Sequence, residues 1–234
     1  MSVRLHGRVQ GAPLTLSPAP PRTADGPPAR PVRLEPLIGA PKRTIATRLD
    51  RIEVWFVMDD SGSMYATWGD PTGIRYAAAL SLLRLMREAS GGYAGVVHWG
   101  STAPDEMVTG PLPVRRRRPL NASLAVPATT LGGNDLPAAL RRTAERADRD
   151  RAVLACVITD GIETVTDSTH ESVSALPPGS VHLLLVDRAR QCDPAMEAAW
   201  RAVAFGSFTR LNTFNTRAMA EQLAAVLSRA LGLA

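Results

Sequence analysis

The chain has 234 residues, of which 45% are hydrophobic, and it has a formal net charge of +5. This length suits one α/β domain with an appendage, and the apolar fraction is sufficient for a full core. The most apolar runs, such as Val181–Val186, have the length of a strand and are too short to cross a membrane. Arg4, His6 and Arg8 interrupt any apolar signal segment after Met1, so we expect a cytoplasmic protein.

Arginine supplies almost all of the positive charge, since Lys42 is the only lysine. The one local concentration is Arg115–Arg118, which lacks the interleaved aromatic residues that stack on the bases of single strands. We interpret this run as a solvated loop, with a docking patch for an acidic partner as the alternative. Cys156 lies in an apolar run and is expected to be buried and reduced, while Cys192 lies in a polar stretch.

The N-terminal segment has a different composition from the rest of the chain. Residues 2–10 alternate between apolar and polar side chains, as a half-exposed strand would. From Gly11 to Pro41 prolines recur every few residues, which forbids a helix and permits only short edge pairing. We therefore predict a proline-rich arm over residues 1–47, with Val32–Leu34 as a candidate short strand, followed by a globular domain over residues 48–234.

Strands and helices alternate through the globular part. The first helix is expected to begin at Asp70-Pro71, and the prolines at 111 and 113 suit a strand at a sheet edge. The predicted strands are Ile52–Met58, Tyr93–Trp99, Met107–Val114, Ala152–Thr159, Val181–Val186 and Phe205–Leu211. The predicted helices are Ile74–Glu88, Leu136–Asp148, Ser168–Leu176, Asp193–Val203 and Thr216–Leu231. This alternation predicts an α/β fold: a doubly wound, mainly parallel six-stranded sheet with helices on both faces.

A cluster of polar residues follows the first predicted strand. Asp59, Ser61 and Ser63 offer hard oxygen atoms two residues apart, and Gly62 allows a turn tight enough to bring them together. This pattern is typical of a loop that binds a divalent cation. An ordinary Asp/Ser/Gly turn is the alternative.

Two further loops offer donors of the same kind. Gly132-Gly133-Asn134-Asp135 precedes a predicted helix, and Thr159-Asp160-Gly161 ends the fourth strand. Neighbouring parallel strands end at the same edge of a sheet, so these loops can meet in one crevice. Their side chains complete a set of two carboxylates, two hydroxyls and an amide oxygen, which suits magnesium, manganese or calcium. The candidate ligands are Asp59, Ser61, Ser63, Asn134 and Asp160.

The combination resembles the von Willebrand factor A (vWA) domain and its metal-ion-dependent adhesion site (MIDAS), from about Arg51 to the C-terminus. Asp59-x-Ser61-Gly62-Ser63-Met64 matches the family's first motif, in a form frequent in bacterial members, and Thr159-Asp160-Gly161 matches its third. Asn134 stands where the family usually has threonine. If Asp135 bound the metal instead, the site would have three carboxylates and would favour calcium. The resemblance implies a Mg²⁺-dependent protein–protein binding module, with Mn²⁺ or Ca²⁺ as alternatives. It also implies a partner that supplies an Asp or Glu to the metal, and bacterial members often work beside AAA+ ATPases.

We expect the side chain of Asp60 to point away from Asp59, where it either contacts the residues that hold the site or faces solvent. We expect His98 to be buried or partly buried.

A metal-dependent hydrolase or phosphotransferase is the first alternative to a binding module. However, Ser61 breaks the D-x-D pattern, and the phosphate-binding G-x-x-x-x-G-K-[ST] loop is missing. A basic nucleic-acid-binding protein is the second alternative. We therefore predict that the protein is not an enzyme.

Overall fold

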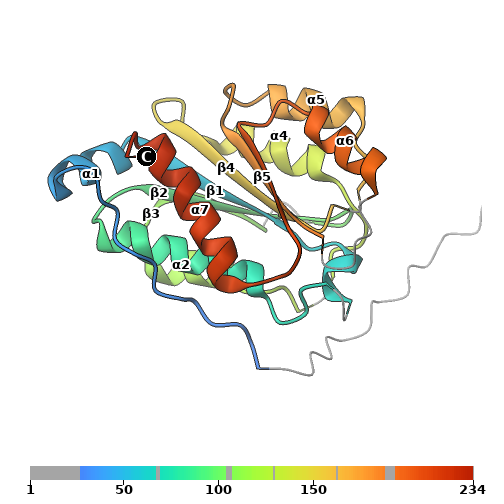
Figure 1. The fold of residues 1–234 in the computed structure, drawn as a ribbon, viewed down its shortest axis with the longest axis horizontal. Coiled ribbons are helices and arrows are strands. Elements are labelled where there is room, and N and C mark those ends of the chain that lie inside the picture. The colour runs from blue at the N-terminus through green and yellow to red at the C-terminus, as the bar shows by residue number, and fades with distance from the viewer. Residues whose placement is uncertain are drawn as a thin grey trace, which may run out of the picture.

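The computed structural model describes residues 27–66, 69–103, 107–128, 130–161, 163–187 and 193–233. The described residues form a six-stranded sheet in the order β3-β2-β1-β4-β5-β6 (Figure 1). Strand β3 is antiparallel to β2, and the other neighbouring pairs are parallel. The strands are β1 Ile52–Asp59, β2 Tyr93–Trp99, β3 Val108–Pro113, β4 Ala152–Thr159, β5 Val181–Val186 and β6 Ser207–Leu211. The predicted fold class is therefore confirmed.

Helices cover both faces of the sheet (Figure 1). Residues of α1, α2, α3 and α7 join one core cluster, and residues of α4, α5 and α6 join the other. No helix in the described ranges is long and apolar enough to cross a membrane. The helices are α1 Lys42–Leu49, α2 Ile74–Glu88, α3 Arg117–Ser123, α4 Leu136–Arg146, α5 Asp167–Ser174, α6 Pro194–Ala202 and α7 Thr216–Ala230, with the 3₁₀ helix η1 at Gly62–Tyr65.

Strand β1 lies in the middle of the sheet and all eight of its residues are buried. Successive side chains of a strand point to opposite faces. Phe56 and Met58 accordingly enter the core beside α2 and α7, whereas Trp55 and Val57 enter the core beside α4. Burial on both faces explains why the sequence here is apolar without alternation.

The start of α2 differs from the prediction. The helix begins at Ile74 rather than at Asp70-Pro71, and its N-cap is Gly73, whose φ of 77° lies in the left-handed region open to glycine. Asp70 nevertheless caps the helix, because its two carboxylate oxygens accept from Ile74 N at 2.6 Å and from Arg75 N at 2.9 Å. The proline at 71 therefore lies in the turn before the helix.

The described part of the N-terminal arm, residues 27–41, contains no strand, so the prediction of a strand at Val32–Leu34 is wrong. Val32 N donates instead to Ser81 Oγ of α2 at 2.9 Å, and Leu34 is buried in the core. The arm thus lies along the domain through side-chain burial rather than sheet pairing. Helix α1 follows it and was not predicted, and the predicted strand at residues 2–10 lies outside the described residues.

The arginine run does not form a loop throughout. Arg117 and Arg118 begin α3, a short helix that the sequence analysis did not include, while Arg115 and Arg116 form the turn before it. All four arginines are exposed, as predicted. Cys156 is buried as a free thiol, whereas Cys192 lies outside the described residues.

Candidate functional site

The structure brings together the three loops that the sequence analysis singled out. Leu131 N donates to Asp60 O and Gly62 N donates to Gly132 O, both at 2.8 Å, so the middle loop is attached to the loop after β1. Asp60 N in turn donates to Trp99 O at the end of β2 at 2.9 Å. The carboxyl ends of β1 and β2 and the loop before α4 are therefore joined by backbone hydrogen bonds.

Gly132 of the middle loop allows this close approach. Gly132 has φ of 86°, and a Cβ atom there would lie 2.6 Å from Ser101 Oγ. The same hydroxyl accepts from Gly133 N at 2.8 Å, and Ser101 N donates to Gly133 O at 2.8 Å. A larger residue at 132 would strain the backbone and collide with this pairing.

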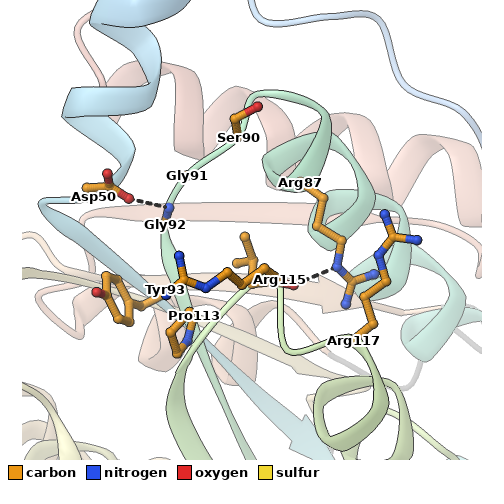
Figure 2. A pocket seen from close by; sticks show the side chains of 10 residues that line it. Asp50, Arg87, Ser90, Gly91, Gly92, Tyr93, Pro113, Arg115 and Arg117 are labelled. Atoms are coloured by element: carbon orange, nitrogen blue, oxygen red, sulfur yellow. Dashed lines mark hydrogen bonds between the residues drawn. The ribbon is translucent and has the colours of Figure 1, made fainter.

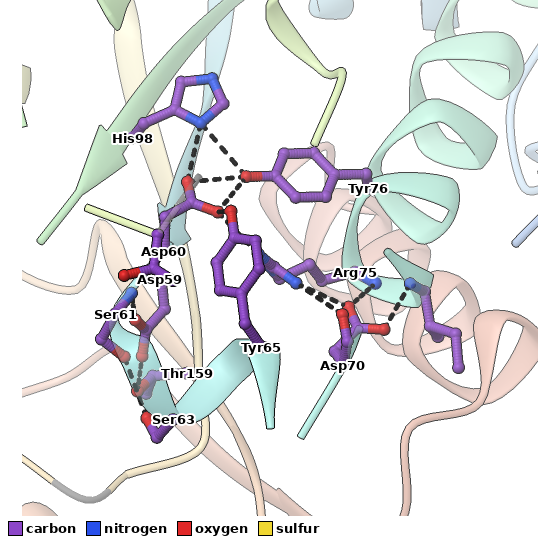
Figure 3. Close-up of polar contacts among 12 residues, drawn as sticks. Asp59, Asp60, Ser61, Ser63, Tyr65, Asp70, Arg75, Tyr76, His98 and Thr159 are labelled. Atoms are coloured by element: carbon purple, nitrogen blue, oxygen red, sulfur yellow. Dashed lines mark hydrogen bonds and ion pairs between the residues drawn. The ribbon is translucent and has the colours of Figure 1, made fainter. Parts of the chain in front are cut away.

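Asp59 lies at the centre of the site and is fully buried (Figure 3). Its Oδ1 accepts from Ser61 N at 2.9 Å, and its Oδ2 accepts from Thr159 Oγ1 at 2.6 Å. The hydroxyls of Ser61 and Ser63 lie 3.0 Å apart. The end of β4 is thus bonded to the end of β1, and the hydroxyls of the first motif lie beside each other in the loop that follows.

The electrostatics of this region favour a cation. Burial, and then the negative charge of Asp160, raise the pKa of Asp59 to about 7. Two buried carboxylates that repel each other are stabilised when a divalent ion neutralises them. No group of three or more His, Cys, Asp or Glu side chains within the described ranges is arranged to hold a metal. The predicted donor set contains only two carboxylates and depends on hydroxyl and amide oxygens for the rest.

Asn134 and Asp135 have different surroundings. Asn134 Oδ1 is buried, and within the described residues it has no hydrogen-bond partner. Asp135 is the N-cap of α4, and its Oδ1 accepts from Ala138 N at 3.0 Å. A buried acceptor atom without a hydrogen-bond donor is suited to contact a bound cation or a water on that cation. The residues present therefore fit the divalent cation that the fold implies.

Glu163 is a residue of this region that the sequence analysis missed. Its Oε1 accepts from Leu136 N at 3.3 Å, and its Oε2 is buried without a hydrogen-bond partner in the described part of the chain. Burial, together with the negative charges of Asp59 and Asp135, raises the pKa of Glu163 to about 7, although the hydrogen bond from Leu136 N acts to lower it. Its position three residues after Asp160, in the same loop, was the available signal.

Asp60 points away from Asp59, as predicted, but it does not face solvent (Figure 3). It is fully buried, with Arg75 Nη2 at 2.6 Å, the Tyr76 hydroxyl at 2.6 Å and His98 Nδ1 at 2.8 Å. Burial alone would raise the pKa of Asp60, but the Arg75 guanidinium and His98 lower it below its ordinary value. The expectation of a solvent-facing carboxylate is therefore wrong, and the alternative of a group behind the site fits the structure.

His98 has the buried role that was expected. Its Nδ1 contacts Asp60, and its Nε2 lies 2.7 Å from Ser123 O at the end of α3. Both ring nitrogens thus have protein partners, and the imidazole connects β2 with the loop after β1 and with α3.

No family model and no curated protein matches the chain. Solved structures do match its fold. A von Willebrand factor type A protein from Catenulispora acidiphila has a TM-score of 0.55 at 17% identity, over 78% of this chain and 43% of the other. An aerotolerance-related membrane protein from Bacteroides fragilis has a TM-score of 0.52 at 16% identity, over 76% of this chain and 99% of the other. The PilB minor pilin from Streptococcus sanguinis has a TM-score of 0.55 at 10% identity, over 80% of this chain and 63% of the other.

These similarities concern the fold. The chain spans less than two thirds of the lengths of the Catenulispora and Streptococcus proteins. The sheet order, the two helical layers and the structural matches together show that this chain has the fold of a vWA domain.

Proposed function

We propose that the domain binds a divalent cation at the loops after β1 and β4 and, through it, a carboxylate of a partner protein. Asp59 and Asp160 would supply the negative charge, and Ser61, Ser63 and Asn134 would supply neutral oxygen donors. The observation on which this rests is the convergence of these loops around the buried carboxylate of Asp59. Mg²⁺ is the expected ion, with Mn²⁺ or Ca²⁺ as alternatives.

The cation would supply an open coordination position that an Asp or Glu of a partner can fill. Two carboxylates neutralise a divalent ion, so a third one from outside is accepted most readily when the remaining ligands are neutral. The hydroxyls of Ser61 and Ser63 meet that condition. This favours a protein-interaction module whose partner presents an acidic side chain, with an AAA+ ATPase system as one candidate source.

The proposal treats the domain as a binding module and not as an enzyme. A hydrolytic reaction at the cation would require a nearby group that takes up a proton. His98 was the histidine available for that role, but both of its ring nitrogens are engaged, by Asp60 and by Ser123 O. No histidine or lysine occurs in the three motif segments themselves.

Thermal unfolding with and without metal tests the site. Ligand binding at one hundred times the Kd stabilises the folded state by about 2.7 kcal/mol, or roughly 5 to 10 °C for a domain of this size. We expect MgCl₂ or MnCl₂ at pH 8 to raise the Tm of the wild type by that order, EDTA to reverse the rise, and Asp59→Asn to abolish it. The exposed Asp167 lies on α5, so Asp167→Asn is the control that keeps the full response.

Ser63→Ala provides a second variant, since it removes a proposed ligand that lies closer to the surface than Asp59. We expect it to reduce the metal response while the metal-free Tm stays within a few degrees of the wild type. Equal metal responses in the wild type, Asp59→Asn and Ser63→Ala would contradict the assigned site.

A further inference from the structure

A pocket of about 480 Å³ lies beside the start of β2, and Figure 2 shows the residues that line it. The candidate metal site lies at the opposite end of the sheet. Tyr93, the first residue of β2, lines the pocket, whereas Trp99 at the other end of that strand contacts the site loops. The remaining walls come from the residue after α1, the end of α2 and the turn that follows it, the end of β3 and the turn into α3. The pocket is therefore separate from the residues proposed to bind metal.

Arg87 is held in this pocket by neutral groups. Its Nε donates to Val114 O at 2.7 Å, and its Nη2 donates to Asn121 Oδ1 at 3.0 Å. These two bonds fix the plane of the guanidinium, but neither neutralises its charge. A guanidinium has five N–H donors, so further donors are available to a ligand.

Arg115 and Arg117 also line the pocket, and both are exposed. Among the described residues, Arg87, Arg115 and Arg117 form no ion pair with a carboxylate. Figure 2 shows the side chains of Arg87 and Arg117 next to each other. Burial, and then the positive charge of Arg117, lower the pKa of Arg87, as expected for two cations held together without an anion.

Asp50 is the acidic residue among those that line the pocket, and its Oδ1 accepts from Gly92 N at 3.1 Å. Three positive charges and this one negative charge leave the pocket with a formal charge of +2. A phosphate monoester has a charge of about −1.5 to −2 at neutral pH and three strong acceptor oxygens. Guanidinium groups bind such oxygens in pairs, with short charge-assisted hydrogen bonds.

We infer that this pocket binds a phosphate monoester, with Arg87 and Arg117 as its principal contacts and Arg115 as the third positive charge. The pocket is larger than a phosphoryl group, so the esterified organic part enters it as well. The phosphoryl group can belong to a phosphorylated small molecule or to a phosphorylated side chain of a protein. The chemistry of recognition is the same for both sources.

The test is calorimetric titration of the full chain at about 0.15 M salt with a capped Gly-phosphoserine-Gly peptide, the same peptide with Glu in place of phosphoserine, glucose 6-phosphate and inorganic phosphate. We expect Arg117→Gln to weaken binding of the phosphopeptide about tenfold, since charge-assisted hydrogen bonds are lost. Arg118→Gln is the matched control, because it removes the same charge from the next residue, whose side chain does not line the pocket. It should change the affinity by less than about twofold, since exposed charges at a distance are screened.

Equal weakening by Arg117→Gln and Arg118→Gln would overturn the inference, because it would show attraction to general positive charge. Binding of the Glu peptide as tight as that of the phosphopeptide, or no binding of any probe at millimolar concentration, would overturn it too. Tighter binding of the phosphopeptide than of glucose 6-phosphate would support a phosphorylated protein as the source, and the reverse order would support a phosphorylated small molecule. Binding of inorganic phosphate as tight as that of both esters would overturn the inference, because it would show that the organic part makes no contribution.

Discussion

Asn134 and Asp135 are adjacent polar residues with different structural roles. Asp135 caps α4, because its side-chain Oδ1 accepts a hydrogen bond from Ala138 N. Asn134 has a buried carbonyl oxygen without a hydrogen-bond partner in the described part of the chain. The capping role of Asp135 favours Asn134 as the donor that this loop offers to a cation, which would leave the site with two carboxylates rather than three.

Two alanine variants separate these roles. Asn134→Ala should weaken Mn²⁺ binding about tenfold or more, as loss of a metal-site group commonly does, with little change in metal-free stability. Asp135→Ala should lower the free energy of unfolding by about 1 kcal/mol, as loss of an N-cap does, and leave Mn²⁺ affinity nearly unchanged. Calorimetric titration and urea unfolding in EDTA measure the two quantities. The reverse pattern would identify Asp135 as the ligand and would favour calcium.

At the scale of single residues, the sequence showed which side chains share a loop better than it showed their surroundings. The spacing of Asp59, Ser61 and Ser63 was sufficient to place them on one loop. It could not show that Asp60 would be buried against Arg75, because that contact joins residues fifteen positions apart. Glu163 was missed because it belongs to none of the recognised motifs, and only the fold places it beside the start of α4.

At the scale of elements, burial on both faces made the central strands predictable. Strands β1, β4 and β5 have six to eight residues, most of them apolar, and their bounds agree with the prediction to within one residue. Helices α1 and α3 were missed for a physical reason. Each has only seven or eight residues and one or two buried side chains, and α3 contains a proline, so neither shows a helical apolar pattern.

The first turn of α2 is attached to the loop after β1 by a buried arginine (Figure 3). Arg75 Nη2 contacts Asp60 at 2.6 Å and its Nη1 contacts Asp70 at 3.0 Å, and all three side chains are fully buried. The guanidinium carbon also lies 4.5 Å from the centre of the Tyr76 ring. One cation thus compensates two buried carboxylates behind the candidate site.

Removing that cation should destabilise the whole domain. Breaking a buried ion pair by deleting one partner typically costs about 3 to 5 kcal/mol, because a charge is left without compensation. We therefore expect Arg75→Met to lower the free energy of unfolding by that amount in urea titrations at pH 7.5. Arg84→Met on the same helix is the control: its exposed pair with Glu88 should contribute no more than about 0.5 kcal/mol. Similar losses for the two variants would show that Asp60 and Asp70 do not depend on Arg75.

At the scale of the whole molecule, the two candidate sites lie at opposite ends of β2. The strand has seven residues, so its ends are roughly 20 Å apart at about 3.3 Å per residue. This separation exceeds the Debye length of about 8 Å at physiological salt, so charges at one end have little direct effect at the other. A partner that binds the metal edge and a phosphate monoester that binds the arginine pocket can therefore occupy the domain together.

Capture of a partner from an extract of the native cells tests this separation together with the proposed function. With Mg²⁺ present, the wild type should retain a specific protein that EDTA releases and that Asp59→Asn fails to bind, because the metal is needed to hold the partner's carboxylate. Arg117→Gln should retain the same protein in the same amount, since its substitution lies at the other end of the sheet. Quantitative mass spectrometry of the four samples measures these amounts. Retention by Asp59→Asn or in EDTA would exclude metal-dependent capture, whereas loss with Arg117→Gln alone would show that the arginine pocket, and not the metal edge, binds the partner.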